Sequence, residues 1–134
     1  PLSPAITQPV DIPGDTPPLT FQSFEGGLVE IGACGGFAFD NETPRHKVWL
    51  EPFLLANRPV TQGEFRAFIL DGGYRKPDLW LSDGWSWVQQ QQIERPLYWN
   101  PALTEHFTLA GQQPLHDSQI LAHVNYYEAD AYAR

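Results

Sequence analysis

The chain has 134 residues, of which 42% are hydrophobic and 13% aromatic, and its formal net charge is −8. This composition fits one globular domain and excludes a disordered chain. The acidic balance argues against nucleic acid as a partner, and the short apolar runs exclude a membrane-spanning helix. We therefore expect no membrane partner. Cys34 is the only cysteine, so no disulfide can form within the chain. This favours a reducing compartment, and we expect a cytoplasmic protein.

Both ends of the chain suggest a piece of a longer polypeptide. It begins with Pro1 instead of Met, and it stops at Arg134 within a helical pattern. Residues 1–20 hold six of the 13 prolines, which favours extended, polyproline-like backbone. We therefore expect a linker or strap over residues 1–20 and a folded part over residues 21–134.

Short strands are expected in the first half of the folded part. Glycines bound the apolar stretch Leu28–Ile31, which predicts a strand. Alternation over His46–Leu50 predicts a second strand, and Phe53–Ala56 is expected to be a buried apolar run. Between the first two lies Asp40–Pro44, a turn in which Asp and Asn side chains bond their own backbone.

A helix start follows with a clear local signal. Thr61 can cap a helix while Glu64, three residues later, reaches back to its backbone, which makes a capping box. An apolar stripe at helical spacing then predicts the face turned to the core: Phe65, Phe68 and Ile69. The pair Gly72–Gly73 should end the helix, because glycine tolerates the left-handed conformation.

The second half is rich in aromatic residues. Ser82 or Asp83 is expected to cap a short helix, and its apolar residues are Trp85, Val88 and Ile93. Residues 101–118 are expected to be loop. Asn125 and Glu128 occupy the positions of a second capping box, and the residues of that helix expected to face the core are Ala129, Tyr132 and Ala133. The whole pattern is α+β with a high loop content.

The residues alone carry little recognisable chemistry. No two of the four histidines have the spacing that builds a metal site on one helix face; they are His46, His106, His116 and His123. We therefore assign no metal ligand. The sequence also lacks a Gly-x-Ser-x-Gly nucleophile motif and a glycine-rich phosphate loop.

The aromatic residues allow two interpretations. A cluster between residues 80 and 99 could cage a quaternary ammonium group through cation–π attraction: Trp80, Trp85, Trp87, Tyr98 and Trp99. Alternatively, these large rings fill the core of a loop-rich domain.

Several ordered motifs resemble the sulfatase-modifying-factor domain family, which includes the formylglycine-generating enzymes. The chain shows an acidic turn at Asp40–Glu42, Pro44 with His46, and the block Pro59–Phe65. The later segment HVNYYEADAYAR is similar to another family block. The forms AFDNETPRH, DGGYRKPDLWLSDGW and RPLYW are typical of one branch, the iron-dependent sulfoxide synthases of ergothioneine biosynthesis.

This resemblance implies a C-type-lectin-like α+β fold, of which residues 21–134 would be the N-terminal portion. It also implies Fe(II) held by a helical domain outside this chain. The substrates would be trimethylhistidine and a cysteine-containing thiol, joined with oxygen.

The residues expected to bind the trimethylammonium group are Tyr74, Trp80 and Trp85, while the resemblance supplies no catalytic residue for this chain. The alternatives are a non-catalytic, lectin-like binding or scaffold module and a relative that uses another thiol or a selenium donor. The thiol donor and the oligomeric state stay open.

Overall fold

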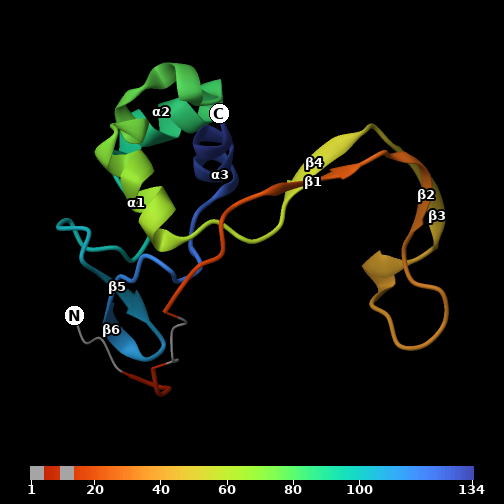
Figure 1. Cartoon of the computed structure of the whole chain (residues 1–134), viewed down its shortest axis with the longest axis horizontal. Helices are drawn as coiled ribbons and strands as arrows, with labels where there is room; N and C mark the ends of the chain where they lie inside the picture. The colour runs from red at the N-terminus through yellow and green to blue at the C-terminus, as the bar shows by residue number, and fades with distance from the viewer. Residues whose placement is uncertain (1–4, 10–13) are drawn as a thin grey trace. The chain divides into compact units, whose positions relative to one another are not determined.

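The computed structural model describes residues 5–9 and 14–134. The chain divides into two compact units, which are described separately. The strand unit is Pro18–Arg58, and the helical unit comprises Pro59–Arg134 with the described residues up to Pro17 (Figure 1). The expected linker over residues 1–20 lies partly outside the described residues, and its boundary with residues 21–134 stays a prediction.

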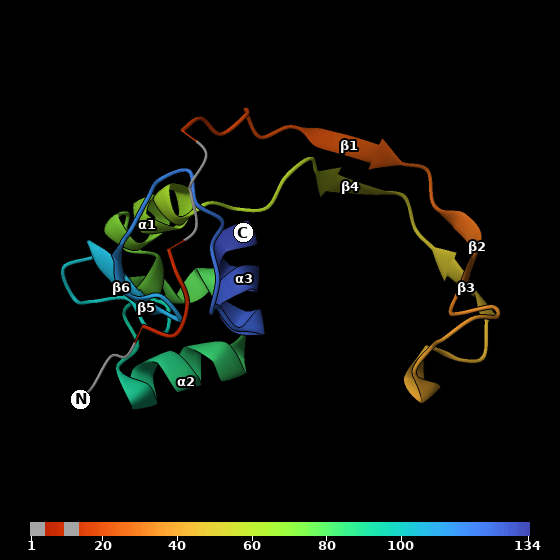
Figure 2. The same ribbon diagram turned by 90° about the horizontal axis from the view of Figure 1, so that it is seen from below.

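The strand unit consists of two antiparallel pairs (Figure 2). Strand β1 (Phe21–Phe24) pairs with β4 (Phe53–Ala56), and β2 (Gly27–Ile31) pairs with β3 (His46–Leu50). The strands predicted at β2 and β3 are confirmed, whereas β1 was not foreseen. The predicted turn is confirmed as the 3-10 helix Asp40–Glu42, where the Asp40 side chain accepts the backbone N–H of the next residue at 2.9 Å.

The expectation that Phe53–Ala56 is a buried run is wrong. The segment is a strand, but Phe53, Leu54 and Leu55 are 41%, 64% and 56% exposed. A two-stranded pair has two faces, and burial of both requires further layers of structure. The ring of Phe53 stacks on that of Phe24 at 4.9 Å between centroids, which covers only part of one face.

In its described residues, the helical unit holds three short α-helices, two 3-10 helices (Gly73–Arg75 and Pro77–Leu79) and one hairpin. The α-helices are α1 (Gln62–Leu70), α2 (Ser82–Gln91) and α3 (Tyr126–Ala133). They lie side by side in both views (Figures 1 and 2). The hairpin is β5 (Glu105–Thr108) with β6 (Gly111–Pro114). The class is α+β, as predicted, and no helix in the described part of the chain has the length and hydropathy needed to cross a bilayer.

The helix ends follow local rules with one exception. Both capping boxes are confirmed, since Thr61 and Asn125 each exchange two hydrogen bonds with the Glu three residues later. Gly72 adopts φ of 83°, as expected for a residue that ends α1. The predicted cap of α2 is wrong: Leu81 is its N-cap, and Ser82 already lies in the first turn.

The expectation of loop over residues 101–118 is also wrong, because β5 and β6 form there. The hairpin turns between Thr108 and Gly111, and Gly111 takes the left-handed φ of 83° that this turn requires. Its strands, EHFT and GQQP, contain few β-branched residues. Their sequence therefore gives little strand signal.

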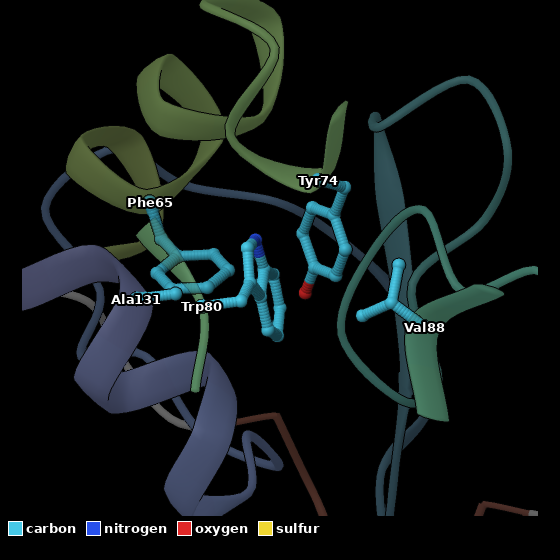
Figure 3. Packing of buried hydrophobic residues seen from close by; sticks show 5 residues of the cluster. All are labelled: Phe65, Tyr74, Trp80, Val88 and Ala131. Atoms are coloured by element: carbon cyan, nitrogen blue, oxygen red, sulfur yellow. The ribbon is translucent and has the colours of Figure 1, made fainter. Parts of the chain in front are cut away.

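The core of the helical unit is an aromatic cluster (Figure 3). Its buried members come from all three helices and from the turns between α1 and α2: Phe65, Tyr74, Trp80, Val88 and Ala131. Trp80 lies between Phe65 and Tyr74 (Figure 3), and its indole Nε1 donates to the Gly73 carbonyl at 2.9 Å. The stripe predicted on α1 is confirmed, because Phe68 and Ile69 pack against this cluster.

The core-facing side of α3 differs from the predicted one. Tyr132 packs on Phe65, as expected, with ring centroids 5.4 Å apart. Ala129 and Ala133 are exposed, whereas Glu128 and Ala131 are buried. A buried carboxyl group is tolerated at Glu128 because two donors satisfy it, the Tyr74 hydroxyl and the Asn125 backbone N–H.

Candidate functional site

The structure places the residues predicted to bind a trimethylammonium group in and around this core. Tyr74 and Trp80 are 5% and 7% exposed, and their ring centroids lie 5.3 Å apart. Trp85 is partly buried and packs against the same cluster. Two of the three residues are thus in direct contact, with their rings covered by core packing. Their role in binding stays a prediction.

An aromatic cavity of about 590 Å³ lies beside this core. It is bounded by the end of α2, the segment 92–99 and the start of α3. Three of the five rings considered for a cage line it, namely Trp87, Tyr98 and Trp99. The other lining residues are Gln91, Gln92, Ile93, Glu94, Arg95, Pro96, Leu97, His123, Val124, Asn125 and Glu128. The volume is within the range that small-molecule sites occupy.

Backbone contacts fix the aromatic wall of the cavity. The Trp99 N–H donates to the Pro96 carbonyl at 3.3 Å, which closes a turn. The Phe107 N–H of β5 donates to the Tyr98 carbonyl at 3.0 Å. Arg95 donates from Nε to the Trp99 carbonyl at 3.0 Å. The unforeseen hairpin is therefore the support that holds Tyr98 and Trp99 in place.

Three residues of the cavity have unusual backbone conformations, and one of them, Gln92, has φ of 52°. Tyr98 and His123 have φ of 72° and 62°, in the left-handed region. Their rings meet edge to face, with centroids 5.0 Å apart and planes at 87°. A left-handed conformation costs a residue other than glycine about 1–3 kcal/mol and is enriched at functional sites. The edge-to-face contact fixes the ring of Tyr98 at the wall of the cavity.

The cavity also contains a buried carboxyl group. Glu128 is 3% exposed and accepts hydrogen bonds from Tyr74 at Oε1 and from the Asn125 N–H at Oε2. Burial raises the pKa of Glu128, although both hydrogen bonds act in the opposite direction. Burial and the Glu128 charge raise the pKa of Tyr74, so the phenol stays a hydrogen-bond donor. When ionised, Glu128 places a negative charge in the wall of a cavity that is also lined by three aromatic rings.

The histidines of the described chain do not fit a metal centre. His106 is buried, and its pKa is lowered first by burial, then by His123 and His116. Its Nε2 has no hydrogen-bond partner. Within residues 5–9 and 14–134, no group of three or more His, Cys, Asp and Glu is arranged to hold a metal ion. The described residues by themselves therefore do not form the iron site that the resemblance implies for the longer protein.

Two residues of the cavity were missed as site residues. Glu128 was recognised only as a helix cap, and the aromatic residues nearby gave no sign that its carboxyl group is buried. His123 begins the segment HVNYYEADAYAR, but that resemblance gave its side chain no role. Both enter the cavity through contacts between distant parts of the chain, which no spacing rule reports.

Comparisons with known proteins identify the family of the chain. Residues 16–134 match the family described as the sulfatase-modifying factor enzyme 1-like domain. A protein named hercynine oxygenase from Mycolicibacterium thermoresistibile is 40% identical over 98 residues. Proteins of the same name from Mycolicibacterium smegmatis and Mycobacterium tuberculosis are 38% and 33% identical over 97 and 96 residues.

Each of these alignments spans 72% of this chain but only 22–23% of the relative. The chain thus corresponds to about a fifth of the length of the curated relatives it matches. The family match, in contrast, extends over both units. The chain therefore belongs to the sulfatase-modifying factor enzyme 1-like domain family.

Proposed function

We propose that this chain is part of an iron- and oxygen-dependent sulfoxide synthase that joins a cysteine-containing thiol to hercynine, the trimethylated histidine. The observation that carries this proposal is the similarity to three proteins named hercynine oxygenase. The exposed free thiol of Cys34 is compatible with a reducing cytoplasm, where we place the protein.

The aromatic cavity is the part of this chain that we assign to the trimethylammonium group. Such a group carries a positive charge but no N–H donor, so it binds through ring faces and nearby negative charge. Trp87 and Tyr98 supply rings at the cavity wall, and Glu128 supplies the carboxylate. Tyr74 positions the carboxyl group of Glu128 in this cavity, because its hydroxyl donates a hydrogen bond to Glu128 Oε1.

Trp80 and Trp85 then support the cavity from the core. Trp80 packs on Tyr74 and is held by its own hydrogen bond to Gly73. Trp85 packs against the same cluster on α2, the helix that also carries Trp87. The three residues predicted from the sequence are thus proposed as binding or positioning residues of one site.

Iron belongs to this proposal only as a component of the longer protein. With oxygen, it would supply the oxidising power for forming the carbon–sulfur bond. The described residues offer no metal cluster, so we place the iron ligands outside this chain. The contribution assigned to this chain is binding and orientation of the substrate.

The test of the activity uses the full-length protein that contains this chain. Bound iron is quantified, and sulfoxide formation from hercynine is measured with oxygen and with either cysteine or a cysteine-containing peptide. Iron together with oxygen-dependent turnover supports the proposal. A folded protein with neither bound iron nor turnover would contradict it and favour a lectin-like binding module. Bound iron without turnover of either thiol would favour a relative that uses another thiol or a selenium donor.

The assignment of the cavity is tested separately by binding. Trp87→Leu should weaken the binding of hercynine by on the order of tenfold, as expected when one cation–π partner is lost from a desolvated site. Histidine, which lacks the methyl groups, serves as the comparison ligand. Trp49→Leu is the matched control, because Trp49 is 63% exposed in the strand unit. Undiminished hercynine binding by the Trp87 variant would refute the assignment.

The residues predicted from the sequence receive their own variant. The triple change Tyr74→Phe, Trp80→Phe and Trp85→Phe keeps an aromatic ring at each position and removes the polar atoms of all three residues. We expect weaker hercynine binding in a protein that still folds. Retained affinity would remove these three residues from the site.

A further inference from the structure

A second cavity of the helical unit contains two arginines. It has a volume of about 480 Å³ and lies between the end of α1, the end of α2 and the segment that follows α2. Arg75 and Arg95 line it, together with Glu94 and apolar residues that include Ile69, Leu70 and Val88. We call it the arginine cavity. It adjoins the aromatic cavity, since residues 92–95 line both.

The charges of the helical unit are unevenly partnered. Three of its five Lys and Arg residues form salt bridges: Arg66 with Asp117, Lys76 with Asp71 and Arg134 with Asp130. In the described part of the chain, Arg75 and Arg95 form none. The whole chain has 16 acidic residues for eight Lys and Arg, so carboxylates are abundant. Both unpaired guanidinium groups nevertheless line the same cavity.

Arg95 is only partly satisfied where it lies. It is half-buried, and its Nε donates to the Trp99 carbonyl. The terminal nitrogens of its guanidinium group have no hydrogen-bond partner among the described residues. A partly desolvated guanidinium group gains most from a carboxylate, which it binds with two parallel hydrogen bonds. Arg75 is exposed and adds a second positive charge that an incoming anion meets first.

The remaining lining selects among possible anions. Glu94 places a negative charge at the cavity, and the chain carries a net charge of −8, so a polyphosphate would be repelled. A ligand with one carboxylate and one ammonium group meets both the arginines and Glu94. The walls made by Ile69, Leu70 and Val88 suit an aliphatic body.

We propose that the arginine cavity binds an aliphatic α-amino acid, with its carboxylate on Arg75 and Arg95 and its ammonium group toward Glu94. This site adjoins the proposed hercynine site and shares residues 92–95 with it, but it does not depend on the proposed activity. It has the size of a small-molecule site. No covalent step is part of the proposal.

The probe is L-leucine, titrated into the full-length protein that contains this chain and followed by calorimetry and by the arginine Nε–H resonances. Two analogues dissect recognition. The first, 4-methylpentanoate, lacks the amine, and the second, 3-methylbutylamine, lacks the carboxylate. We expect leucine to bind best, 4-methylpentanoate more weakly and 3-methylbutylamine not at all.

The variants isolate the arginines. Arg75→Gln should weaken the binding of leucine by on the order of tenfold, because one charged hydrogen-bond partner is lost. Lys76→Gln is the matched control: it removes the same charge one residue later, outside the cavity lining, and should leave affinity unchanged. Glu94→Gln should weaken the binding of leucine but not that of 4-methylpentanoate, which has no ammonium group.

Two outcomes would overturn the proposal. One is a folded wild-type protein that does not bind leucine even at about 10 mM, a concentration far above the dissociation constant expected of a specific site. The other is equal affinity in wild type and the Arg75 variant. Because Arg75 is exposed, its variant is expected to fold, and circular dichroism checks this. Hercynine turnover by the same variant is measured independently, so failure of the amino-acid site and failure of the proposed activity are distinguishable.

Discussion

The hydroxyl of Tyr74 donates a hydrogen bond to the carboxyl group of Glu128, 54 residues later in the chain. Tyr74 belongs to the 3-10 helix Gly73–Arg75 after α1, and Glu128 lies in the first turn of α3. The same carboxyl group accepts the Asn125 N–H and closes the capping box of α3. One buried bond therefore joins the core, the start of a helix and the wall of the aromatic cavity.

Tyr74→Phe should destabilise the protein by about 1–3 kcal/mol, because a buried acceptor of Glu128 loses its partner. The free energy of unfolding from urea titration measures this. Tyr126→Phe is the control, since Tyr126 is 70% exposed and its change should be nearly neutral. A double-mutant cycle with Glu128→Gln isolates the pair. A coupling energy near zero would show that the two groups do not interact.

Glu128 should make stability fall as the pH rises. Burial raises the pKa of Glu128 above its ordinary value of 4.5, so the folded state holds this proton more tightly than the unfolded state. Its stabilising contribution is full below pH 4.5 and is lost as the pH rises through the raised pKa. Urea titrations at a series of pH values from 4.5 upward measure how the free energy of unfolding depends on pH. The difference between wild type and Glu128→Gln should show it, and parallel curves would contradict it.

His106 should give a slope of opposite sign. Burial, His123 and His116 lower the pKa of His106 below 6.5, so the unfolded state takes up this proton more readily. Stability is full above pH 6.5 and is lost as the pH falls through the lowered pKa. The His106→Gln variant should lack this loss even if it is less stable at every pH. His46→Gln, at an exposed position of the strand unit, is the control and should keep it.

The parts of the fold that were predictable depend on contacts close in sequence. A capping box needs only a Ser, Thr, Asp or Asn and a Glu three residues later. Thr61 and Asn125 therefore predicted the starts of α1 and α3 correctly. Gly72 marked the end of α1 for an equally local reason. The strands β2 and β3 were visible because their residues alternate or lie between glycines.

The parts that were missed depend on contacts between distant residues. The hairpin β5–β6 has weak strand propensity, yet its Phe107 N–H holds the Tyr98 carbonyl and so shapes the aromatic cavity. Glu128 is polar and was not expected on the core face of α3, because the donor that satisfies it, Tyr74, lies in another element. The sequence indicated an aromatic cluster but could not separate the rings that fill the core from those that line a cavity.

Gly84→Ala should destabilise the protein although alanine is the better helix former. Gly84 is buried within α2, and a Cβ there would lie 2.8 Å from three atoms of Tyr127, including its Cβ. The gain in helix propensity is about 1 kcal/mol, whereas overpacking of this kind costs about 1–3 kcal/mol. We expect a net loss because Tyr127 Cβ cannot move without shifting the backbone of α3.

The measurement is again the free energy of unfolding, with Ser86→Ala as the control. Ser86 is exposed on the same helix, so its change should stabilise slightly, by about 0.5 kcal/mol. A Gly84→Ala protein as stable as wild type would mean that α2 and α3 tolerate a wider separation. Since Trp87 on α2 and Glu128 on α3 line the aromatic cavity from opposite helices, the same variant should also weaken hercynine binding if the proposed site is correct.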